Sequence, residues 1–333
     1  MKTAVFSTHK FEKPFLESAN NGTHELIYLD TRLNFDTASL ANNCEAVSLF
    51  VNDDASADVL KKLVSLGVKA IVLRSAGFNN VDLEEANKLR IRIARVPAYS
   101  PYSVAEHAVA LMLALNRKLV RAHNRIREMN FSLDGLTGFD MNGKTVGIIG
   151  TGKIGAIVSR IMHGFGCRVL AFDVNENIEI KEKYKIEYLD LDSVFRQSDI
   201  ITLHVPMSDK TKHMINKTTL DTMKRGVMLI NTSRGGLVNT KEVVQALKTG
   251  HLGYLGMDVY EEEEGLFFED HSENILQDDV IARLMTFQNV LITSHQAFLT
   301  ETALGNIAGT TIENLNCFAE NKSCENELIG KKL

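Results

Sequence analysis

The chain has 333 residues, of which 44% are hydrophobic and 24% charged, and its formal net charge at pH 7 is −5. This length predicts two globular domains, and the acidic balance argues against a nucleic-acid-binding protein. The sequence holds no apolar stretch of the roughly 20 residues that a membrane-spanning helix needs. Met1–Ser7 does not resemble a signal peptide, and the four cysteines lack metal-binding spacing. We therefore expect a cytoplasmic protein with reduced thiols and no metal.

Short apolar runs alternate with helical patterns over residues 1–96. This alternation predicts a parallel sheet with helices on both faces. Ligands bind at the carboxyl ends of strands in such sheets, and the segment Arg74–Asn80 directly follows a predicted strand. The predicted strands are Thr3–Phe6, Glu25–Leu29, Ala46–Phe50, Ala70–Leu73 and Ile91–Val96.

A long helical pattern comes next, from Tyr102 to about Arg127. Pro101 suits the first position of a helix, and Ser100 can cap it. Because the pattern stands between two α/β units, we expect one long helix that crosses from one domain to the other. A looser stretch, Phe131–Asn142, leads from this helix to the next strand.

Three glycines, Gly150, Gly152 and Gly155, follow the β-branched run Val146–Ile149 at the GxGxxG spacing. An apolar helical pattern comes after them, so the glycines occupy a strand-to-helix turn. Glycine there permits a tight turn and lets the backbone approach a pyrophosphate, which the helix N-terminus attracts. The unit predicts a dinucleotide site.

The next apolar run, Arg168–Phe172, ends in Asp173. A carboxylate at this place can accept hydrogen bonds from both hydroxyls of an adenosine ribose, and it repels a 2′-phosphate. The alternative is that Asp173 only begins a turn. Within the complete strand–turn–helix–strand unit we favour the first interpretation, which predicts NAD and not NADP as the cofactor.

Further strands are predicted at Ile200–Val205, Val227–Asn231, Tyr254–Val259 and Val290–Ser294, with a helix at Lys241–Lys248 among those between them. The last helical pattern, Glu301–Ala319, has no strand after it. We expect this helix to pack on the first domain, which would make that domain discontinuous.

Three predicted strand ends carry reactive side chains: Arg234, the run Glu261–Glu264, and His295. Reduction of a 2-keto acid requires a proton donor, and histidine suits that role because its pKa lies near neutrality. It also requires a cation for the carboxylate, and the arginine fork matches one. A carboxylate beside the histidine would orient it.

Each of these residues also has a structural interpretation. Arg234 could be a surface arginine, and Glu261–Glu264 could be a solvated run. A lone histidine that follows a strand is more often structural than catalytic, and for His295 alone the two interpretations are equally balanced. The pattern does not decide which glutamate faces the site. Other histidines are interpreted as core or surface residues: His107, His204 and His251.

Several motifs together resemble the D-2-hydroxyacid dehydrogenase family. They are Gly147–Gly155, Asn231–Gly236, Gly256–Glu261 and Ser294–Phe298. Within the family, the chain is similar to the bacterial fermentative D-lactate dehydrogenases at Arg74–Asp82, Val96–Tyr99 and Phe131–Phe139. The similarity covers nearly the whole chain. One departure is Gly236, where relatives often have a larger residue, and we do not expect it to affect the chemistry.

The resemblance implies an α/β fold with two doubly wound parallel-sheet domains and the active site in the cleft. A flavodoxin-like substrate domain would comprise residues 1–100 plus 299–333, and a Rossmann NAD-binding domain residues 101–298. The family also implies a homo-oligomer, a dimer or a tetramer, with a small-molecule substrate, no nucleic acid and no membrane.

The resemblance further implies roles for individual residues. Arg234 would bind the substrate carboxylate, His295 would be the acid–base catalyst, and Glu263 would be its partner. Around the substrate, beside Arg234 and His295, it places Ser75, Ala76, Gly77, Tyr99 and Phe298. Against the cofactor it places Gly150, Gly152, Lys153, Ile154, Gly155, Asp173, Val205, Pro206, Thr232, Ser233 and Asp258.

The implied activity is NAD-dependent reduction of pyruvate to D-lactate, with the reverse oxidation. One alternative is a dehydrogenase for a larger or phosphorylated D-2-hydroxy acid, for which Arg74 is the evident phosphate-binding candidate. Another is an NADH-sensing binding protein on the same scaffold, although such proteins usually carry long disordered tails. Formate oxidation fits less well, because that branch pairs its histidine with glutamine.

Overall fold

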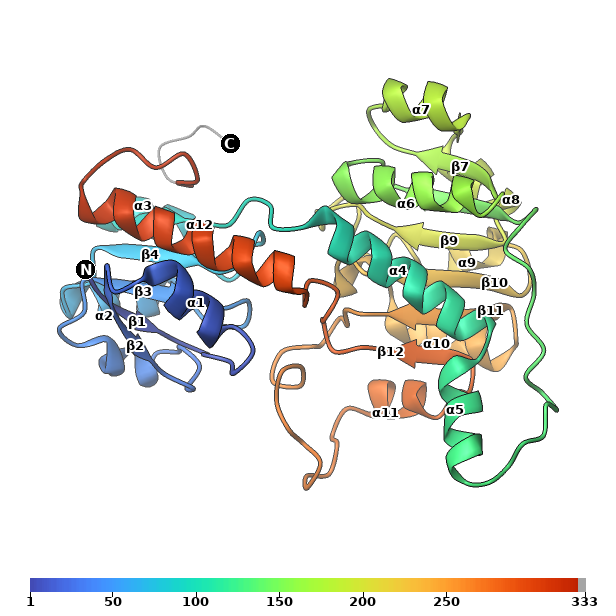
Figure 1. Ribbon diagram of the computed structural model, residues 1–333, viewed down its shortest axis with the longest axis horizontal. Coiled ribbons are helices and arrows are strands. Elements are labelled where there is room, and N and C mark those ends of the chain that lie inside the picture. The colour runs from blue at the N-terminus through green and yellow to red at the C-terminus, as the bar shows by residue number, and fades with distance from the viewer. Residues whose placement is uncertain (329–333) are drawn as a thin grey trace. The chain divides into compact units, whose positions relative to one another are not determined.

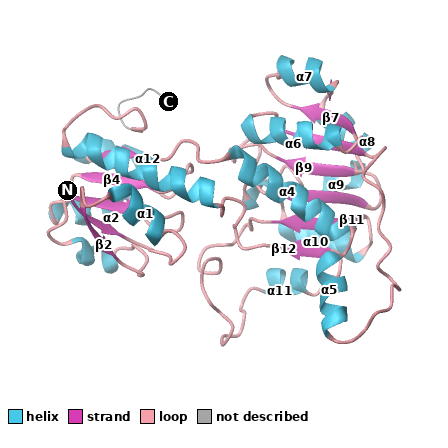
Figure 2. Cartoon of the chain, in the orientation of Figure 1, coloured by secondary structure: helices cyan, strands magenta, loops and turns pink. Residues whose placement is uncertain are grey.

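The computed structural model describes residues 1–328, and the chain divides into two compact units (Figure 1). Unit 1 contains Met1–Ser100 together with the chain from Leu299 onward, and unit 2 contains Pro101–Phe298. Each unit is built on one parallel sheet (Figure 2). This confirms the predicted α/β class with two parallel-sheet domains.

The sheet of unit 1 has five strands in the order β2-β1-β3-β4-β5, all parallel. The buried residues of its central strands are mostly apolar, as a parallel sheet covered by helices requires. The strands are β1 (Lys2–Val5), β2 (Glu25–Tyr28), β3 (Ala46–Leu49), β4 (Ala70–Leu73) and β5 (Arg92–Ala94).

Helices cover both faces of this sheet. They are α1 (Lys13–Asn20), α2 (Ala57–Ser65), α3 (Leu83–Leu89) and α12 (Glu301–Ala319), with a short 3-10 helix at Thr37–Ala41. One core cluster lies under α2 and α3, and α12 covers the other face beside α1. Ile312, Leu315 and Phe318 of α12 pack on that face. His24 Nε2 lies 2.9 Å from Asn316 Oδ1, which joins the two ends of the sequence.

The sheet of unit 2 has seven parallel strands in the order β12-β11-β10-β9-β6-β7-β8. The strand order reverses between β6 and β9, and ligands bind at such a switch point in open α/β sheets. The strands are β6 (Thr145–Ile149), β7 (Arg168–Phe172), β8 (Glu187–Tyr188), β9 (Ile200–Leu203), β10 (Val227–Asn231), β11 (Leu252–Met257) and β12 (Val290–Ile292).

Two apolar layers sandwich this sheet. One lies under α4, α6 and α7, and the other lies under α8, α9, α10 and α11. The helices are α4 (Pro101–Asn116), α5 (Leu119–Arg127), α6 (Lys153–Gly164), α7 (Ile178–Tyr184), α8 (Leu191–Gln197), α9 (Lys217–Thr222), α10 (Thr240–Lys248) and α11 (Asp279–Met285), with a 3-10 helix at Gly235–Leu237. The arrangement is the doubly wound fold that the βαβ pattern predicts.

The single long helix predicted after Pro101 is wrong in two respects. The helix is broken between α4 and α5, where Lys118 adopts a left-handed φ of 51°. Both pieces belong to unit 2, so neither crosses to the other domain. A left-handed residue interrupts the 3.6-residue repeat without a glycine or proline to signal it. The pattern alone therefore did not reveal the break.

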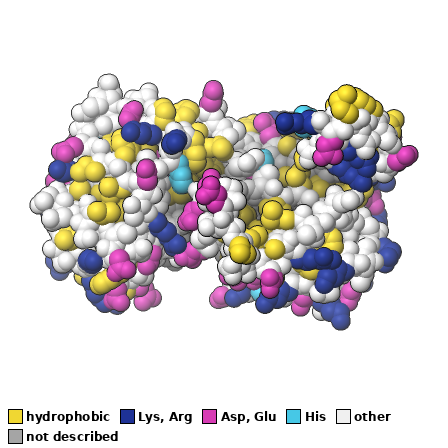
Figure 3. All heavy atoms as spheres, turned by 90° about the horizontal axis from the view of Figure 1, so that it is seen from below, with side chains coloured by type: hydrophobic (Ala, Val, Ile, Leu, Met, Phe, Trp, Pro, Cys, Tyr) yellow, Lys and Arg dark blue, Asp and Glu magenta, His cyan; other side chains and the backbone are white. Residues whose placement is uncertain are grey.

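Acidic and basic side chains are interspersed over the face of each unit drawn in Figure 3. In the part of the chain that the structure describes, no helix is long and apolar enough to cross a membrane. Among the same residues, no cluster of histidine, cysteine and acidic side chains could hold a metal ion, and the four cysteines are unpaired thiols.

Candidate active site

The glycine turn of unit 2 is held tightly between neighbouring strand ends. Gly150 has a φ of +94°, and a Cβ there would lie 2.7 Å from the carbonyl oxygen of His204. A Cβ on Gly155 would lie 1.9 Å from the Gly150 carbonyl oxygen, so helix α6 can approach the turn only with glycine. Gly152 faces open space. The N-terminus of α6 is therefore accessible to a pyrophosphate, as the spacing predicts.

Asp173 follows β7 and lies beside the same turn. Its Oδ2 accepts a hydrogen bond of 2.6 Å from the Thr151 N–H, and its Oδ1 accepts one of 3.0 Å from the Asn175 N–H. Partial burial raises the pKa of the Asp173 carboxyl, but the hydrogen bonds from Asn175 and Thr151 outweigh it, and the net pKa lies below the usual range. The group is thus an anion at the carboxyl end of β7, beside the glycine turn.

The loops after β9 and β10 are joined beside the turn, where Ser233 Oγ donates a 2.6 Å hydrogen bond to the Val205 carbonyl oxygen. The Thr232 hydroxyl is buried and finds no hydrogen-bond partner within residues 1–328. An orphaned hydroxyl at the edge of a dinucleotide fold suits a polar ligand group. Lys153, at the start of α6, and Pro206, in the loop after β9, are exposed. Together with the open glycine turn, this edge fits an NAD molecule.

Arg234 stands in extended conformation directly after these residues, with φ −144° and ψ 138°. Its carbonyl oxygen accepts a 2.8 Å hydrogen bond from Asn231 Nδ2, and its Nη1 donates one of 2.7 Å to the Ser233 carbonyl. A Cβ on Gly235 would lie 2.1 Å from the Tyr260 carbonyl carbon, so the Arg234 loop lies against the end of β11.

The glutamate run after β11 divides between two histidines. Glu263 Oε1 lies 2.9 Å from His295 Nδ1, and Glu263 Oε2 accepts a 3.1 Å hydrogen bond from the Tyr260 N–H. Glu261 instead contacts His213 Nε2, from the loop after β9. Glu262 and Glu264 are exposed. Sequence reasoning overlooked His213, because its loop carries no motif.

Asp258, at the end of β11, anchors the loop that presents His295. Its Oδ1 accepts hydrogen bonds from the Thr293 hydroxyl at 2.6 Å and the Gln296 N–H at 2.8 Å, and its Oδ2 accepts one of 2.8 Å from the Ala297 N–H. Burial raises the pKa of Asp258, but hydrogen bonds, first among them that from His107, lower it overall. The buried carboxylate therefore keeps its charge and fixes the loop.

The histidines interpreted as structural have distinct surroundings. His107 Nε2 lies 3.0 Å from Thr293 Oγ1 and 3.4 Å from Asp258 Oδ1, so it supports the His295 loop. Burial lowers the pKa of His204 to about 3, which keeps that ring neutral.

The remaining predicted substrate residues belong to unit 1, except for Phe298, a partly exposed side chain that ends unit 2. Ser75 Oγ donates a 2.8 Å hydrogen bond to the Gly77 carbonyl, and Arg95 Nη1 donates one of 2.6 Å to the Ala76 carbonyl. These bonds shape the loop after β4. The carbonyl of Tyr99 accepts a hydrogen bond of 2.5 Å from Asn306 Nδ2.

The guanidinium of Arg74 is not accessible to a ligand. Its side chain is fully buried and forms an ion pair with Glu12, with Nε 2.9 Å from Oε2. Further hydrogen bonds run from the guanidinium to the Ser48 hydroxyl and to the carbonyls of Phe6 and Ser7. With its donors satisfied inside unit 1, Arg74 offers no free group to a substrate phosphate.

Unit 2 thus brings the glycine turn, Asp173, Arg234, Glu263 and His295 to the carboxyl-end edge of one doubly wound sheet. A histidine held by a carboxylate can exchange a proton, and an arginine can bind a carboxylate group. This fold and this edge define an NAD-dependent dehydrogenase of the Rossmann class.

Comparisons with known proteins give the family. A sequence profile described as D-isomer specific 2-hydroxyacid dehydrogenase, NAD binding domain, matches residues 109–297. The chain is 50% identical to D-lactate dehydrogenase of Escherichia coli strain K12 over 330 residues, which are 99% of this chain and 100% of that protein. The protein therefore belongs to the D-isomer-specific 2-hydroxyacid dehydrogenases.

Solved structures agree. The apo structure of the Escherichia coli D-lactate dehydrogenase superposes with a TM-score of 0.91 at 48% identity, over 99% of this chain and 100% of that one. The Aquifex aeolicus D-lactate dehydrogenase complexed with NAD and lactic acid gives a TM-score of 0.87 at 34% identity, over 99% and 100%. The pyruvate reductase of Chlamydomonas reinhardtii gives 0.93 at 44% identity, over 98% of both chains.

Proposed function

We propose that this protein is an NAD-dependent D-lactate dehydrogenase that reduces pyruvate to D-lactate and catalyses the reverse oxidation. The observation that carries the proposal is the 2.9 Å pair of His295 and Glu263 on the sheet edge that also bears Arg234. The names of the relatives support it, because D-lactate dehydrogenases and a pyruvate reductase match nearly the whole chain.

Arg234 binds the carboxylate of the keto acid through its guanidinium fork, which orients the carbonyl group. His295 uses Nδ1 toward Glu263, which leaves Nε2 for the substrate oxygen. Protonated Nε2 donates to the carbonyl oxygen during reduction, and neutral Nε2 accepts the hydroxyl proton during oxidation. Glu263 fixes the orientation of the ring through its contact with Nδ1.

NADH, when bound, supplies the hydride for this reduction. The backbone of the turn at Gly150, Gly152 and Gly155 would hold its pyrophosphate, and Asp173 would accept hydrogen bonds from its ribose. The cofactor would supply a hydrogen-bond partner for the buried Thr232 hydroxyl. The other residues proposed to line the cofactor site are Lys153, Ile154, Val205, Pro206, Ser233 and Asp258.

Unit 1 is proposed to be the substrate domain and unit 2 the NAD-binding domain, with the active site in the cleft. Ser75, Ala76, Gly77 and Tyr99 would then contribute to the pocket from unit 1, and Phe298 from unit 2. Support comes from the loop after β4, which stands at the carboxyl end of its strand. The buried ion pair of Arg74 and Glu12 favours an unphosphorylated substrate.

The test follows NADH absorbance in the presence of purified protein and a panel of 2-keto acids, with chiral analysis of the product. We expect pyruvate to have the highest specificity constant and D-lactate to be the product. A larger or phosphorylated keto acid with a higher specificity constant would replace the substrate assignment. Absence of turnover with every member of the panel would instead favour a binding protein.

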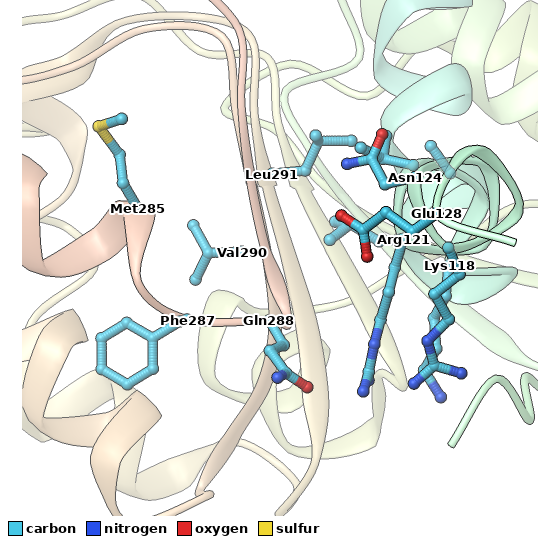
Figure 4. Close-up of a pocket in the computed structure, with 13 residues that line it drawn as sticks. Lys118, Arg121, Asn124, Glu128, Met285, Phe287, Gln288, Val290 and Leu291 are labelled. Carbon is cyan, nitrogen blue, oxygen red and sulfur yellow. The ribbon is translucent and has the colours of Figure 1, made fainter. Parts of the chain in front are cut away.

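We also propose that the protein is a homo-oligomer, a dimer or a tetramer. Within α5 (Leu119–Arg127) no residue is buried, and Phe131 and Leu133 after it are 66% and 80% exposed. Beside α5 is a hollow of about 400 Å3, whose far side carries Met285 and Phe287 (Figure 4). The exposed apolar side chains of Phe131 and Leu133 support an interface between copies, and the hollow itself is lined by apolar and charged side chains alike. Light scattering of the wild type and of Phe131→Asp would test it: a wild-type monomer contradicts the proposal.

The cytoplasm is the proposed compartment. Its reducing conditions suit the four unpaired thiols. Fractionation of the source cells, with the protein followed by antibody, tests this assignment, and recovery outside the cytoplasm would contradict it.

A further inference from the structure

A second histidine–carboxylate pair lies close to the Arg234 loop in unit 2. His213 Nε2 contacts Glu261 Oε1, and the two side chains are 34% and 26% exposed. His213 comes from the loop after β9, whereas Glu261 follows β11, so the pair bridges the ends of two strands that flank β10. Neither residue contacts His295 or Glu263 in the hydrogen bonds of the described chain.

The backbone of the His213 loop is hydrogen-bonded to the segment that follows Arg234. The His213 N–H donates a 2.8 Å hydrogen bond to the Gly236 carbonyl, and the Ile215 N–H donates one of 3.0 Å to the Leu237 carbonyl. The Asn239 N–H returns one of 2.8 Å to the Ile215 carbonyl. The 3-10 turn after Arg234 is therefore tied along one side to the His213 loop.

The other side of the same turn rests on the residues around Glu261. A Cβ on Gly235 would lie 2.5 Å from the Glu261 nitrogen, so the two backbones are in direct contact. Glu263, which pairs with His295, is only two residues further along. The His213–Glu261 pair thus closes a ring of contacts around Gly235 and Gly236, next to the residue proposed to bind the substrate carboxylate.

We propose that His213 and Glu261 are a positioning pair, which fixes the Arg234 loop against the strand end that carries the Glu263–His295 pair. This inference rests on the proposed function, in which Arg234 binds the carboxylate of the substrate. His213 has a left-handed φ of 50°, a conformation that asparagine tolerates. The loop geometry can therefore be retained while the reach of the side chain is removed.

The experiment compares His213→Asn, His213→Gln, Glu261→Gln and the double variant His213→Asn/Glu261→Gln. Glu262→Gln, in the same run but exposed, is the matched control. Steady-state kinetics with pyruvate and NADH are measured for each protein, together with NADH affinity by fluorescence and the melting temperature.

We expect His213→Asn and Glu261→Gln to raise the KM for pyruvate roughly ten-fold with a smaller change in kcat, because a misplaced Arg234 weakens carboxylate binding. NADH affinity should not change. His213→Gln keeps a donor near the Nε2 position and should recover part of the loss. The double variant should be no worse than the poorer single variant, because contacting residues are not additive.

A KM for pyruvate within about two-fold of wild type in both single variants overturns the inference. A fall in the melting temperature of these variants without a change in KM also overturns it, because the pair would then stabilise the fold without positioning Arg234. Arg234→Lys separates this failure from a failure of the proposed function, since that variant should lose pyruvate binding in either case. If the wild type prefers another 2-keto acid, the same comparison is made with that acid, and a protein that reduces none overturns both.

Discussion

The side chain of Arg234 can be tested without altering its charge. Lysine keeps the cation but loses the fork, so Arg234→Lys should raise the KM for pyruvate and lower kcat. We expect a loss of about 2–5 kcal/mol in transition-state binding. Assays at several pyruvate concentrations give kcat and KM, from which the loss in transition-state binding is calculated. NADH fluorescence checks that cofactor binding is retained. Near-normal pyruvate kinetics would remove Arg234 from the site.

Glu263 allows a prediction about proton donation. Its carboxylate lies 2.9 Å from His295 Nδ1, where it can hold the ring in one orientation. In Glu263→Gln the ring loses this charged partner and is oriented less firmly toward the substrate oxygen. The kcat for pyruvate reduction should therefore fall, while Glu262→Gln leaves it unchanged, and steady-state assays measure both. An unchanged kcat in Glu263→Gln would mean that the pair does not control proton donation.

Asp173 is predicted to select NADH. Partial burial raises the pKa of its carboxyl, but hydrogen bonds lower the pKa overall, so the group is an anion that would repel a 2′-phosphate in the proposed site. Asp173→Ser should reduce the preference for NADH over NADPH by about ten-fold or more. The ratio of the two specificity constants measures the effect, and the KM for pyruvate is the control. A wild type that uses NADPH equally well would contradict the role of Asp173.

At the scale of elements, the loop from β12 to α12 depends on Asp258. Asparagine at this position would turn an amide N–H2 toward donors that now bond to a carboxylate, so Asp258→Asn leaves at least one buried donor unsatisfied. We expect a loss of about 1–3 kcal/mol in the free energy of unfolding, together with a lower kcat as the His295 loop shifts. Urea unfolding and steady-state assays measure the two effects. Asp209→Asn, on an exposed loop, is the control and should change neither.

The strands of both sheets could be predicted because each central strand is a buried apolar run bounded by turn residues. Two elements could not. Strand β8 (Glu187–Tyr188) has two residues and no pattern of its own. The break at Lys118 depends on one residue with a left-handed φ. Local sequence reports neither, because a two-residue strand has no repeat and a lysine does not signal a left-handed conformation.

The site shows the same division. The glycine turn and Asp173 have a sequence spacing that follows from the strand–turn–helix geometry, so they could be predicted from the residues. The residues alone did not distinguish Glu261 from Glu263, because the loop after β11 has no repeat to fix which side chain turns inward. Resemblance to relatives singled out Glu263, and the contact with His295 agrees with that choice. Partnerships across strand ends, such as Glu261 with His213, require the fold.

For the whole molecule, His204 should make the protein sensitive to acid. Burial lowers its pKa in the folded state to about 3, from an ordinary value of 6.5. Below pH 6.5 the unfolded chain therefore binds a proton that the folded chain refuses until about pH 3, and stability falls across this window. Between pH 7 and pH 5 the loss should be at most about 2 kcal/mol.

Urea unfolding at these two pH values tests the assignment. His204→Gln should lose less stability than the wild type between them, whereas His123→Gln, on an exposed helix position, should lose the same amount. An equal loss in wild type and His204→Gln would show that other groups account for the acid sensitivity.

The discontinuity of unit 1 has a consequence for how the protein folds during its synthesis. The ribosome releases the five strands of that unit first, but α12, which covers one face of their sheet, is made after all of unit 2. The contact between His24 and Asn316 spans 292 positions. A nascent chain must therefore carry the uncovered face of β3 and β4 through the synthesis of a complete second unit. During that interval this apolar face is a natural substrate for chaperones, and unit 2 is the part that can fold first.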